Sequence, residues 1–220
     1  MKLLAIENLS TLAICAKTNP KSEISNQKSE MAVKPLRVVA GTARGIHLRS
    51  VPGDNTRPIT DRAKESLFNI LRPHLHGAAF LDLFAGTGDV GIEALSQGAG
   101  LARFLDNQRA AIDTINANLA TTKLAKSAQV QQGDSFAHLA GRPDHAFDYV
   151  FIAPPQFHEL WKRALVALDD QPAWLVEDGW AIVQIDPTEY EKLDLQNLDE
   201  FDQRKYGNVL LVFYERKAGD

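Results

Sequence analysis

One short stretch of the chain combines an acidic side chain with a glycine turn. Asp82 lies in an apolar run, and Gly86 and Gly88 follow it before a helical pattern that continues through residues 92–95. A buried strand, a glycine turn and a helix in this order form a ligand-binding unit of parallel α/β proteins, because glycine allows close backbone approach and the first N–H groups of the helix are free. A carboxylate at the mouth of this turn favours a cationic amino-acid or sulfonium ligand over a pyrophosphate. The glycines alone leave open a tight turn without any ligand.

Two further acids follow expected strands later in the chain. Asp106 ends an expected strand at 101–105, about 20 residues past the glycines, where nucleotide-binding folds receive ribose hydroxyls. Capping of the next helix is the alternative role for this carboxylate. Asp134 follows an expected strand at 128–132, and we expect its carboxylate to reach an adenine amino group.

The apolar patterns predict the strands and helices that position these acids. Residues 79–91 are expected to form a strand, a turn and the start of a helix. Further strands are expected at 101–105, 128–132, 147–152 and 180–185, with helices after Asp106 and at about 159–168. Residues 201–205 and 209–214 are expected to close the chain as an antiparallel pair at the sheet edge.

Residues 34–64 form a basic segment on an otherwise acidic chain. Seven Lys and Arg residues accompany two Asp residues in this segment, whereas the net charge of the whole chain is −4. Such a segment is a candidate phosphate-binding surface. A merely solvated basic face is the alternative.

The same segment is expected to contain a hairpin and a helix. Two short strands, 36–40 and 46–48, surround a turn whose tip carries Arg44. Thr60 is expected to cap a helix that buries one apolar face and ends at Pro73. The residues expected on that face are Ala63, Leu67, Ile70 and Leu71.

The bulk properties suit one α/β domain with a short appendage. The chain has 220 residues, of which 45% are hydrophobic, enough to fill a single core. Its apolar runs are all shorter than the roughly 20 residues of a membrane span, so we expect a soluble protein without a membrane partner. The single cysteine, Cys15, excludes an internal disulfide and a cysteine-cage metal site, which fits a reducing compartment.

Residues 1–33 are expected to be mostly disordered, because 18–30 are rich in polar residues and show no steady period. Glu7 and Asn8 interrupt the apolar core that a secretory signal would need. We therefore expect a cytoplasmic protein, with an organelle as the alternative if this segment is a transit peptide. Met31 is an alternative natural start.

Six motifs, in order along residues 36–215, resemble those of the RsmD-type family. They are Arg37-Val-Val-Ala-Gly, Arg57-Pro-Ile-Thr-Asp-Arg, Leu67-Phe-Asn-Ile-Leu, Leu81-Asp-Leu-Phe-Ala-Gly-Thr-Gly, Gly91-Ile-Glu-Ala-Leu-Ser and Tyr206-Gly-Asn. The enzymes of that family use S-adenosyl-L-methionine (AdoMet) to methylate the exocyclic N2 of a guanine in small-subunit (16S) ribosomal RNA. The ordered N-terminal motifs are more specific than the glycine turn.

The resemblance implies a Rossmann-like AdoMet-dependent methyltransferase fold of the α/β class. We expect a seven-stranded, mostly parallel sheet flanked by helices, with a small basic N-terminal hairpin and helix. The expected organisation is an N-terminal extension at 1–33, the basic hairpin and helix at 34–76 and the methyltransferase domain at 77–220. The implied partner is small-subunit rRNA or its ribosomal particle, and we expect a monomer that uses no metal.

The resemblance also implies roles for individual residues. The cofactor would be held by residues that follow the strands, namely Asp82, Phe84, Gly86, Gly88, Asp106, Asn107, Asp134 and Ser135. RNA phosphates would be contacted by the basic segment, through Arg37, Arg44, Arg57 and Arg62.

The chain departs from the family at the catalytic tetrapeptide, which is Asp or Asn, Pro, Pro, then Tyr or Phe in that family. Here it is Ala153-Pro154-Pro155-Gln156, followed by Phe157. An acceptor side chain at the first position would help to orient the weakly nucleophilic guanine N2, and Ala153 accepts no hydrogen bond. The carbonyl of Pro154 remains an acceptor, and Phe157 is expected to stack on a base turned out of its helix. Alternatively, Pro154 and Pro155 merely end a strand.

Two other functions remain open from the sequence. A non-catalytic relic would keep the fold, the cofactor and RNA but would have lost turnover with the acid at position 153. An NAD-linked oxidoreductase is the weaker alternative, because the glycine turn is short and begins with Asp82.

Overall fold

The computed structural model describes residues 36–53 and 59–218. The sequence-based predictions for residues 1–33, which include Cys15 and Met31, and for Arg57 lie outside these ranges.

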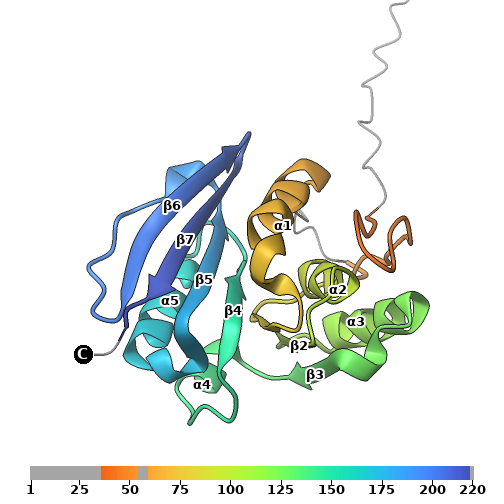
Figure 1. Cartoon of the computed structure of the whole chain (residues 1–220), viewed down its shortest axis with the longest axis horizontal. Coiled ribbons are helices and arrows are strands. Elements are labelled where there is room, and N and C mark those ends of the chain that lie inside the picture. The colour runs from red at the N-terminus through yellow and green to blue at the C-terminus, as the bar shows by residue number, and fades with distance from the viewer. Residues whose placement is uncertain (1–35, 54–58, 219–220) are drawn as a thin grey trace, which may run out of the picture. The chain divides into compact units, whose positions relative to one another are not determined.

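Seven strands form one sheet in the order β3-β2-β1-β4-β5-β7-β6 (Figure 1). The strands are β1 (Ala79–Asp82), β2 (Leu101–Asp106), β3 (Ala128–Gln132), β4 (Phe147–Ile152), β5 (Leu175–Ile185), β6 (Leu198–Tyr206) and β7 (Val209–Arg216). The first five are parallel to one another, and β7 pairs antiparallel with both β5 and β6. This arrangement confirms the predicted seven-stranded, mostly parallel sheet with an antiparallel pair at its edge.

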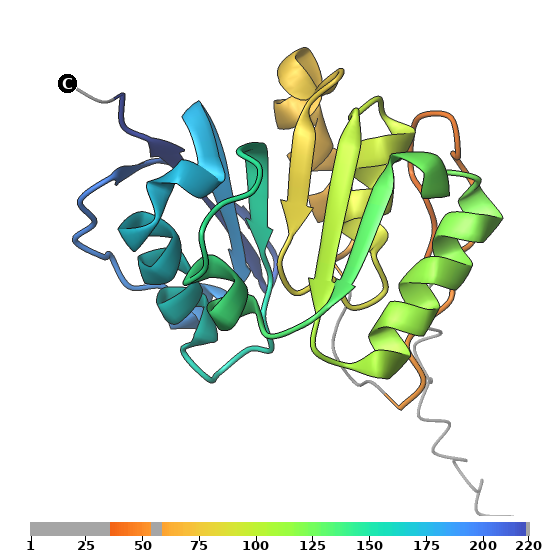
Figure 2. The ribbon, with the colours of Figure 1, turned by 90° about the horizontal axis from the view of Figure 1, so that it is seen from below.

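Helices cover both faces of the sheet (Figure 2). Residues of α1 (Asp61–Leu75), α2 (Asp89–Ser96) and α3 (Arg109–Thr122) belong to one hydrophobic core. Residues of α4 (Ser135–Leu139) and α5 (Leu160–Asp170) belong to the other. The central strands β1 and β4 lie between the two cores, which explains why their sequences are nearly continuous apolar runs.

The strand order changes direction between β1 and β4. The chain runs from β1 outward to β2 and β3, then returns to place β4 on the other side of β1. In open parallel sheets the connections after such neighbouring strands leave a crevice at the carboxyl ends, and ligands bind there. The glycine turn after β1 and the Ala153 loop after β4 both leave the sheet at this edge, because β1 and β4 are parallel neighbours.

The basic segment contains the predicted turn with shorter strands. The strands at 36–40 and 46–48 are reduced to one bridge between Arg37 and His47, supported by a 3.0 Å hydrogen bond from the Val38 N–H to the Ile46 carbonyl. Gly41 has φ +80°, and a Cβ there would lie 1.8 Å from the Ser96 carbonyl oxygen. The turn therefore packs directly against the end of α2, where the Thr42 N–H also donates to the Ser96 carbonyl at 2.8 Å.

Several predicted element boundaries were wrong, including the start of β6, which lies at Leu198 rather than at 201. The helix capped by Thr60 continues past Pro73 to Leu75, which is 1% exposed and anchors the last turn in the core. β5 begins at Leu175, five residues before the expected start, because Leu175 pairs with Phe147 beyond an irregularity in the ladder. Thr60 caps the helix as predicted, through a 3.3 Å hydrogen bond from the Ala63 N–H.

Candidate cofactor-binding and catalytic site

The glycine turn after β1 is built from left-handed residues. Gly86 has φ +51° and Gly88 has φ +77°, a region that side chains with a Cβ seldom adopt. A Cβ added to Gly88 would lie 3.2 Å from Ile115 Cγ1, whereas one added to Gly86 would have no atom within 4 Å. Gly88 therefore packs against α3, and Gly86 leaves free space at the carboxyl end of β1.

Asp106 links the end of β2 to this turn. Its Oδ2 accepts the Gly86 N–H at 2.9 Å, and its Oδ1 accepts the Gln108 N–H at 2.9 Å. The carboxylate is partly exposed, and the neighbouring Asn107 is exposed. Helix capping, the alternative role, is not what Asp106 does, because Gln108 is the N-cap of α3 and has no side-chain cap bond. The Asp106 carboxylate instead holds the turn before α3 and the glycine turn.

Asp82 is buried, where we expected it at the open mouth of the turn. Its side chain is 2% exposed and accepts the Gly91 N–H of α2 at 3.2 Å. The pKa of Asp82 is raised to about 7, mainly by burial; the Gly91 hydrogen bond opposes this rise, and the nearby carboxylates of Asp106 and Asp89 add to it. The carboxyl group of Asp82 therefore titrates near neutral pH, and a cation bound beside it would lower its pKa.

Asp134 and Ser135 lie at the start of α4. Asp134 is exposed and caps the helix by accepting the Ala137 N–H at 2.8 Å, while the buried Ser135 hydroxyl donates to the Leu83 carbonyl. A cavity of about 500 Å³ adjoins this region and is lined by Leu105, Gln131, Gln132, Gly133, Asp134, Ala137 and His138. It lies beside the ends of β2 and β3, so it is the space nearest to the predicted adenine position.

Phe84 is half-buried and belongs to a small aromatic group at the same end of the sheet. Its ring meets Phe136 edge to face with centroids 5.9 Å apart, and the Arg163 guanidinium lies 4.0 Å from the Phe136 ring centroid. This group places an apolar surface and one cation beside the turn that follows β1.

The candidate catalytic loop directly follows β4. Ala153 is partly buried and packs against the hydrophobic core, Pro154 is buried and Pro155 is exposed. Phe157 is 67% exposed, and its N–H donates to Glu189 Oε1 at 2.6 Å. Because β4 pairs with β1, this loop and the glycine turn leave the sheet at the same edge.

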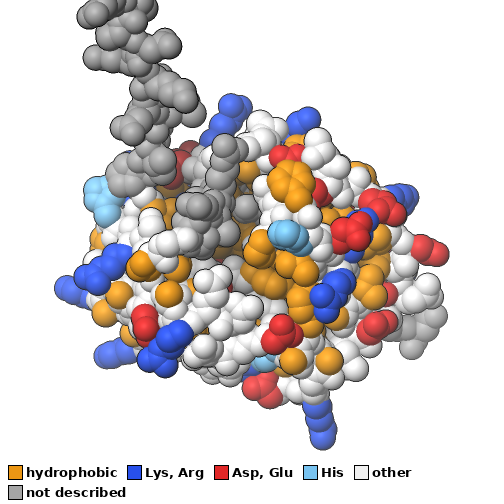
Figure 3. All heavy atoms as spheres, turned by 180° about the vertical axis from the view of Figure 1, so that it is seen from behind, with side chains coloured by type: hydrophobic (Ala, Val, Ile, Leu, Met, Phe, Trp, Pro, Cys, Tyr) orange, Lys and Arg blue, Asp and Glu red, His pale blue; other side chains and the backbone are white. Residues whose placement is uncertain are grey.

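The predicted RNA-binding arginines differ in their surroundings. Arg37 is half-exposed and pairs with Asp61 at 3.1 Å. Arg44 and Arg62 are exposed and form no ion pair among the described residues. Figure 3 shows one face of the molecule, with hydrophobic side chains near its centre and Lys and Arg mainly toward its margins.

Lys64 is one of the seven cations of the basic segment 34–64, and its expected place on the basic surface was wrong. Its side chain is fully buried, where it bonds to Asp89, donates to the Arg37 carbonyl at 2.7 Å and lies 3.6 Å from Glu93. Glu93 in turn accepts the N–H groups of Val39 and Ala40, at 2.8 and 2.9 Å. Lys64 lies three residues before Leu67 and so on the buried face of α1. This spacing was the signal in the sequence that could have predicted its burial.

Asn118 is a second polar residue whose role the sequence did not indicate. It is fully buried on α3 and bonds to Thr87 of the glycine turn and to the backbone of Arg49. Only its place on a helix face shared with buried Ile115 and Leu119 pointed to burial.

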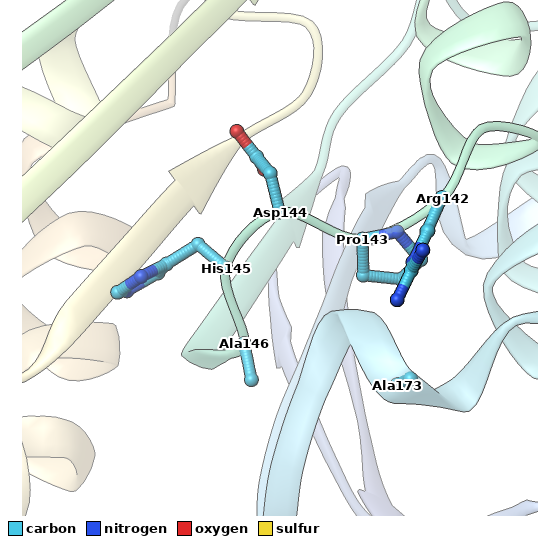
Figure 4. Close-up of a pocket in the computed structure, with 6 residues that line it drawn as sticks. All are labelled: Arg142, Pro143, Asp144, His145, Ala146 and Ala173. Carbon is cyan, nitrogen blue, oxygen red and sulfur yellow. The ribbon is translucent and has the colours of Figure 1, made fainter.

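A further cavity, of about 470 Å³, lies elsewhere (Figure 4). Its lining comprises Arg142, Pro143, Asp144, His145, Ala146 and Ala173. Most of these residues precede β4, whereas the glycine turn and the Ala153 loop follow their strands, so the cavity is at the opposite end of β4. Asp144 bonds to Arg103 at 2.6 Å. This ion pair holds the pKa of the Asp144 carboxyl below its usual value.

The strand order, the glycine turn and the acid at the end of β2 define an AdoMet-dependent methyltransferase. Comparison with known families gives the same result: the model of the family described as Conserved hypothetical protein 95 matches residues 36–215. The chain belongs to this family, which includes the RsmD-type proteins, and the resemblance seen in the sequence motifs is confirmed.

Three comparisons measure the similarity. YlbH of Bacillus subtilis is 41% identical over 153 residues, which cover 69% of this chain and 83% of YlbH. Ribosomal RNA small subunit methyltransferase D of Escherichia coli is 32% identical over 83% of this chain and 91% of its own length. The solved structure of yhhF from Escherichia coli aligns with a TM-score of 0.75 and 32% identity, covering 84% of this chain and 99% of yhhF.

Proposed function

We propose that this protein transfers the methyl group of AdoMet to the exocyclic N2 of a guanine in small-subunit (16S) rRNA. The relatives from Escherichia coli and Haemophilus influenzae are named ribosomal RNA small subunit methyltransferase D. The observation that carries the proposal is that the Asp106-bound glycine turn and the Ala153 loop follow neighbouring parallel strands and leave the sheet at one edge.

The residues present fit AdoMet in charge and in shape. Gly86 leaves free space at the end of β1, and the partly exposed Asp106 lies where ribose hydroxyls are bound in related folds. The cavity beside Asp134 suits the adenine, and the buried Asp82 carboxylate suits the positively charged part of the cofactor. When bound, AdoMet supplies a methyl group already activated by its sulfonium.

The protein then has to position the nucleophile. Correct placement of two reacting groups about 3–3.5 Å apart lowers a barrier by roughly 7–11 kcal/mol. Ala153 offers no acceptor for the amino group, so the carbonyl of the buried Pro154 and neighbouring backbone carbonyls take this role. Phe157 supplies an exposed ring for the base.

The basic segment is the proposed RNA-binding surface. Arg44 and Arg62 are exposed, and the buried Lys64 pairs with Asp89 and lies near Glu93, which fixes the segment to α2. We propose that residues 34–76 form a basic hairpin and helix and that residues 77–220 form the methyltransferase domain. The proposed setting is the cytoplasm, with a monomer acting on rRNA or on its particle.

The described residues contain neither a helix that could span a membrane nor a cluster that could hold a metal ion. Within 36–53 and 59–218, none of the helices is long and apolar enough to cross a membrane. The same ranges contain no group of three or more His, Cys, Asp or Glu side chains arranged to hold a metal ion.

Incubation with labelled AdoMet and undermethylated small-subunit particles tests the proposal. We expect label in the RNA, at a guanine N2 when the nucleosides are analysed. Naked 16S rRNA in parallel distinguishes the free RNA from the particle as substrate.

The absence of an acceptor at Ala153 favours one rival, the non-catalytic relic. The relic binds AdoMet and RNA without transfer, so the same incubation with a binding measurement separates it from the enzyme. Absence of both binding and transfer would favour the oxidoreductase.

A further inference from the structure

Phe157 has a backbone conformation that bulky residues rarely adopt. Its φ is +64°, and Glu159, two residues later, has φ +55°. Left-handed residues other than glycine persist only where the surrounding structure imposes the conformation, and they concentrate at functional sites. Two such residues in the loop after β4 therefore require an external restraint.

Glu189 supplies that restraint from the connection after β5. Its Oε1 accepts the Phe157 N–H at 2.6 Å, and its Oε2 accepts the Asp186 N–H at 3.3 Å. Asp186 in turn accepts the N–H of Thr188 at 2.9 Å, which completes a capping box around the short 3-10 helix η3 (Pro187–Glu189). Both carboxylate oxygens of Glu189 are thus engaged, and the loop after β4 is fixed to a rigid turn.

A second link joins the same two segments. Lys162, in the first turn of α5, donates to Glu159 at 3.1 Å and also bonds to Glu191. The loop after β4 is therefore attached to the connection after β5 on both sides of His158. Because β4 and β5 are parallel neighbours, these attachments lie at the edge of the sheet where the glycine turn also ends.

The side chain held in this way is not used for packing. The Phe157 ring is 67% exposed, more than Phe201 at 46% or Val166 at 43%. A strained backbone that serves the core would bury its side chain. Here the hydrogen bond from the Phe157 N–H to Glu189 instead holds an exposed aromatic ring four residues after Ala153.

We propose that Glu189 is a positioning residue that holds the Phe157 ring where the target base stacks. The inference rests on the proposed function and adds to it a residue outside the tetrapeptide. An aromatic face accepts any base, and stacking on such a face contributes to binding of an unstacked base. Glu189 acts through the backbone of Phe157 and touches neither the base nor AdoMet.

A double-mutant cycle tests this role. Phe157→Asn removes the ring but tolerates the left-handed backbone, and removal of the stacking partner of one base should lower RNA affinity and kcat/KM by about 5- to 150-fold. Glu189→Ala should lower them by about 2- to 10-fold, the effect of one hydrogen bond. In the Phe157→Asn background, Glu189→Ala should have no further effect. Phe157→Tyr should behave like the natural protein.

The matched control is Glu177→Ala, which removes an exposed acid near the start of β5, at the opposite end of that strand from Glu189. It should leave kcat/KM and AdoMet affinity unchanged. A single-stranded RNA containing 2-aminopurine gives an independent signal, because stacking quenches its fluorescence. The quenching should decrease in Phe157→Asn and in Glu189→Ala.

Several outcomes would overturn the inference. Full activity and quenching in Glu189→Ala would do so, as would equal effects of this change with and without the ring. RNA binding with ring-dependent quenching but no methyl transfer would remove the proposed function and retain the positioning role. Failure to bind RNA at all would remove both.

Discussion

The side-chain amide of Asn118 donates a 2.9 Å hydrogen bond to the carbonyl of Thr87, at the centre of the glycine turn. The same amide donates to the Arg49 carbonyl at 3.1 Å, and its oxygen accepts the Arg49 N–H at 2.8 Å. One fully buried side chain on α3 therefore holds both the cofactor turn and the basic segment. Buried backbone N–H and C=O groups have lost their hydrogen bonds to water and need hydrogen-bond partners within the protein.

Asn118→Asp should weaken AdoMet binding by about tenfold, because an acceptor would then face the Thr87 carbonyl. The acceptor for the Arg49 N–H is retained. Thr122→Val is the matched control, since the Thr122 hydroxyl bonds only within α3. Calorimetry should show near-normal affinity in the control, and equal affinities in the two variants would contradict the role of Asn118.

Asp82→Asn should weaken AdoMet binding by about 1.5–3 kcal/mol while keeping an acceptor for the Gly91 N–H. Because the pKa of Asp82 is about 7, the natural protein should lose affinity as pH falls through this value and the carboxylate is protonated. The variant should show a flatter dependence between about pH 6 and 8. Unchanged affinity in a folded variant would refute the assignment.

Asp82→Asn should weaken AdoMet binding but should increase the stability of the folded protein above neutral pH. A folded-state pKa of about 7, above the ordinary value of 3.8, favours the protonated form in the folded protein. The stability associated with this proton is fully present below pH 3.8 and is lost as pH rises through about 7. Asp82→Asn should therefore gain stability over the natural protein toward pH 8, by up to about 4 kcal/mol in urea unfolding.

Replacing Arg44 and Arg62 with Gln should reduce RNA affinity and its dependence on salt. Removal of one arginine–phosphate ion pair lowers the slope of log affinity against log salt by about 0.7–0.9. Arg204→Gln on the edge strand is the control, because this side chain already pairs with Asp202. AdoMet affinity should stay constant in all variants. An unchanged slope would show that the two arginines belong to a solvated surface that does not contact RNA phosphates.

Ala153→Asp should slow methyl transfer, because the new carboxylate would be partly buried without a partner. Ala153→Asn, a neutral acceptor, should harm less. Single-turnover transfer to the undermethylated particle measures both. An increase of about 10²- to 10⁴-fold in Ala153→Asp would instead mean that the natural protein lacks an acceptor it needs.

Lys64→Met should destabilise the protein by about 3–5 kcal/mol, because Asp89 and Glu93 would stay buried without their cation. Burial already raises the pKa of Asp89 to about 6 despite Lys64. Without the cation the protonated form is favoured further, so the destabilisation should be larger at pH 8 than at pH 5 in urea unfolding. Lys162→Met, which breaks more exposed pairs, should cost about 1 kcal/mol or less.

The sequence determined the fold and the glycine turn of the candidate cofactor site. The apolar run at 147–152 forms a strand with those same bounds, because a strand buried on both faces carries mostly apolar residues. The glycines after Asp82 follow a strand and open a helix, and their left-handed φ values explain why both lack a Cβ. The six motifs, in their order along the chain, resemble those of the RsmD-type family, and the family model confirms that resemblance.

Tertiary structure alone decided which polar groups act together. Lys64 reads as a surface cation in the sequence, but packing of α1 on α2 buries it beside Asp89. Glu189 lies 32 residues after Phe157, and only the pairing of β4 with β5 brings the carboxylate to that N–H. No local pattern predicts such bonds, because they depend on how distant elements pack rather than on the conformational preference of any one segment.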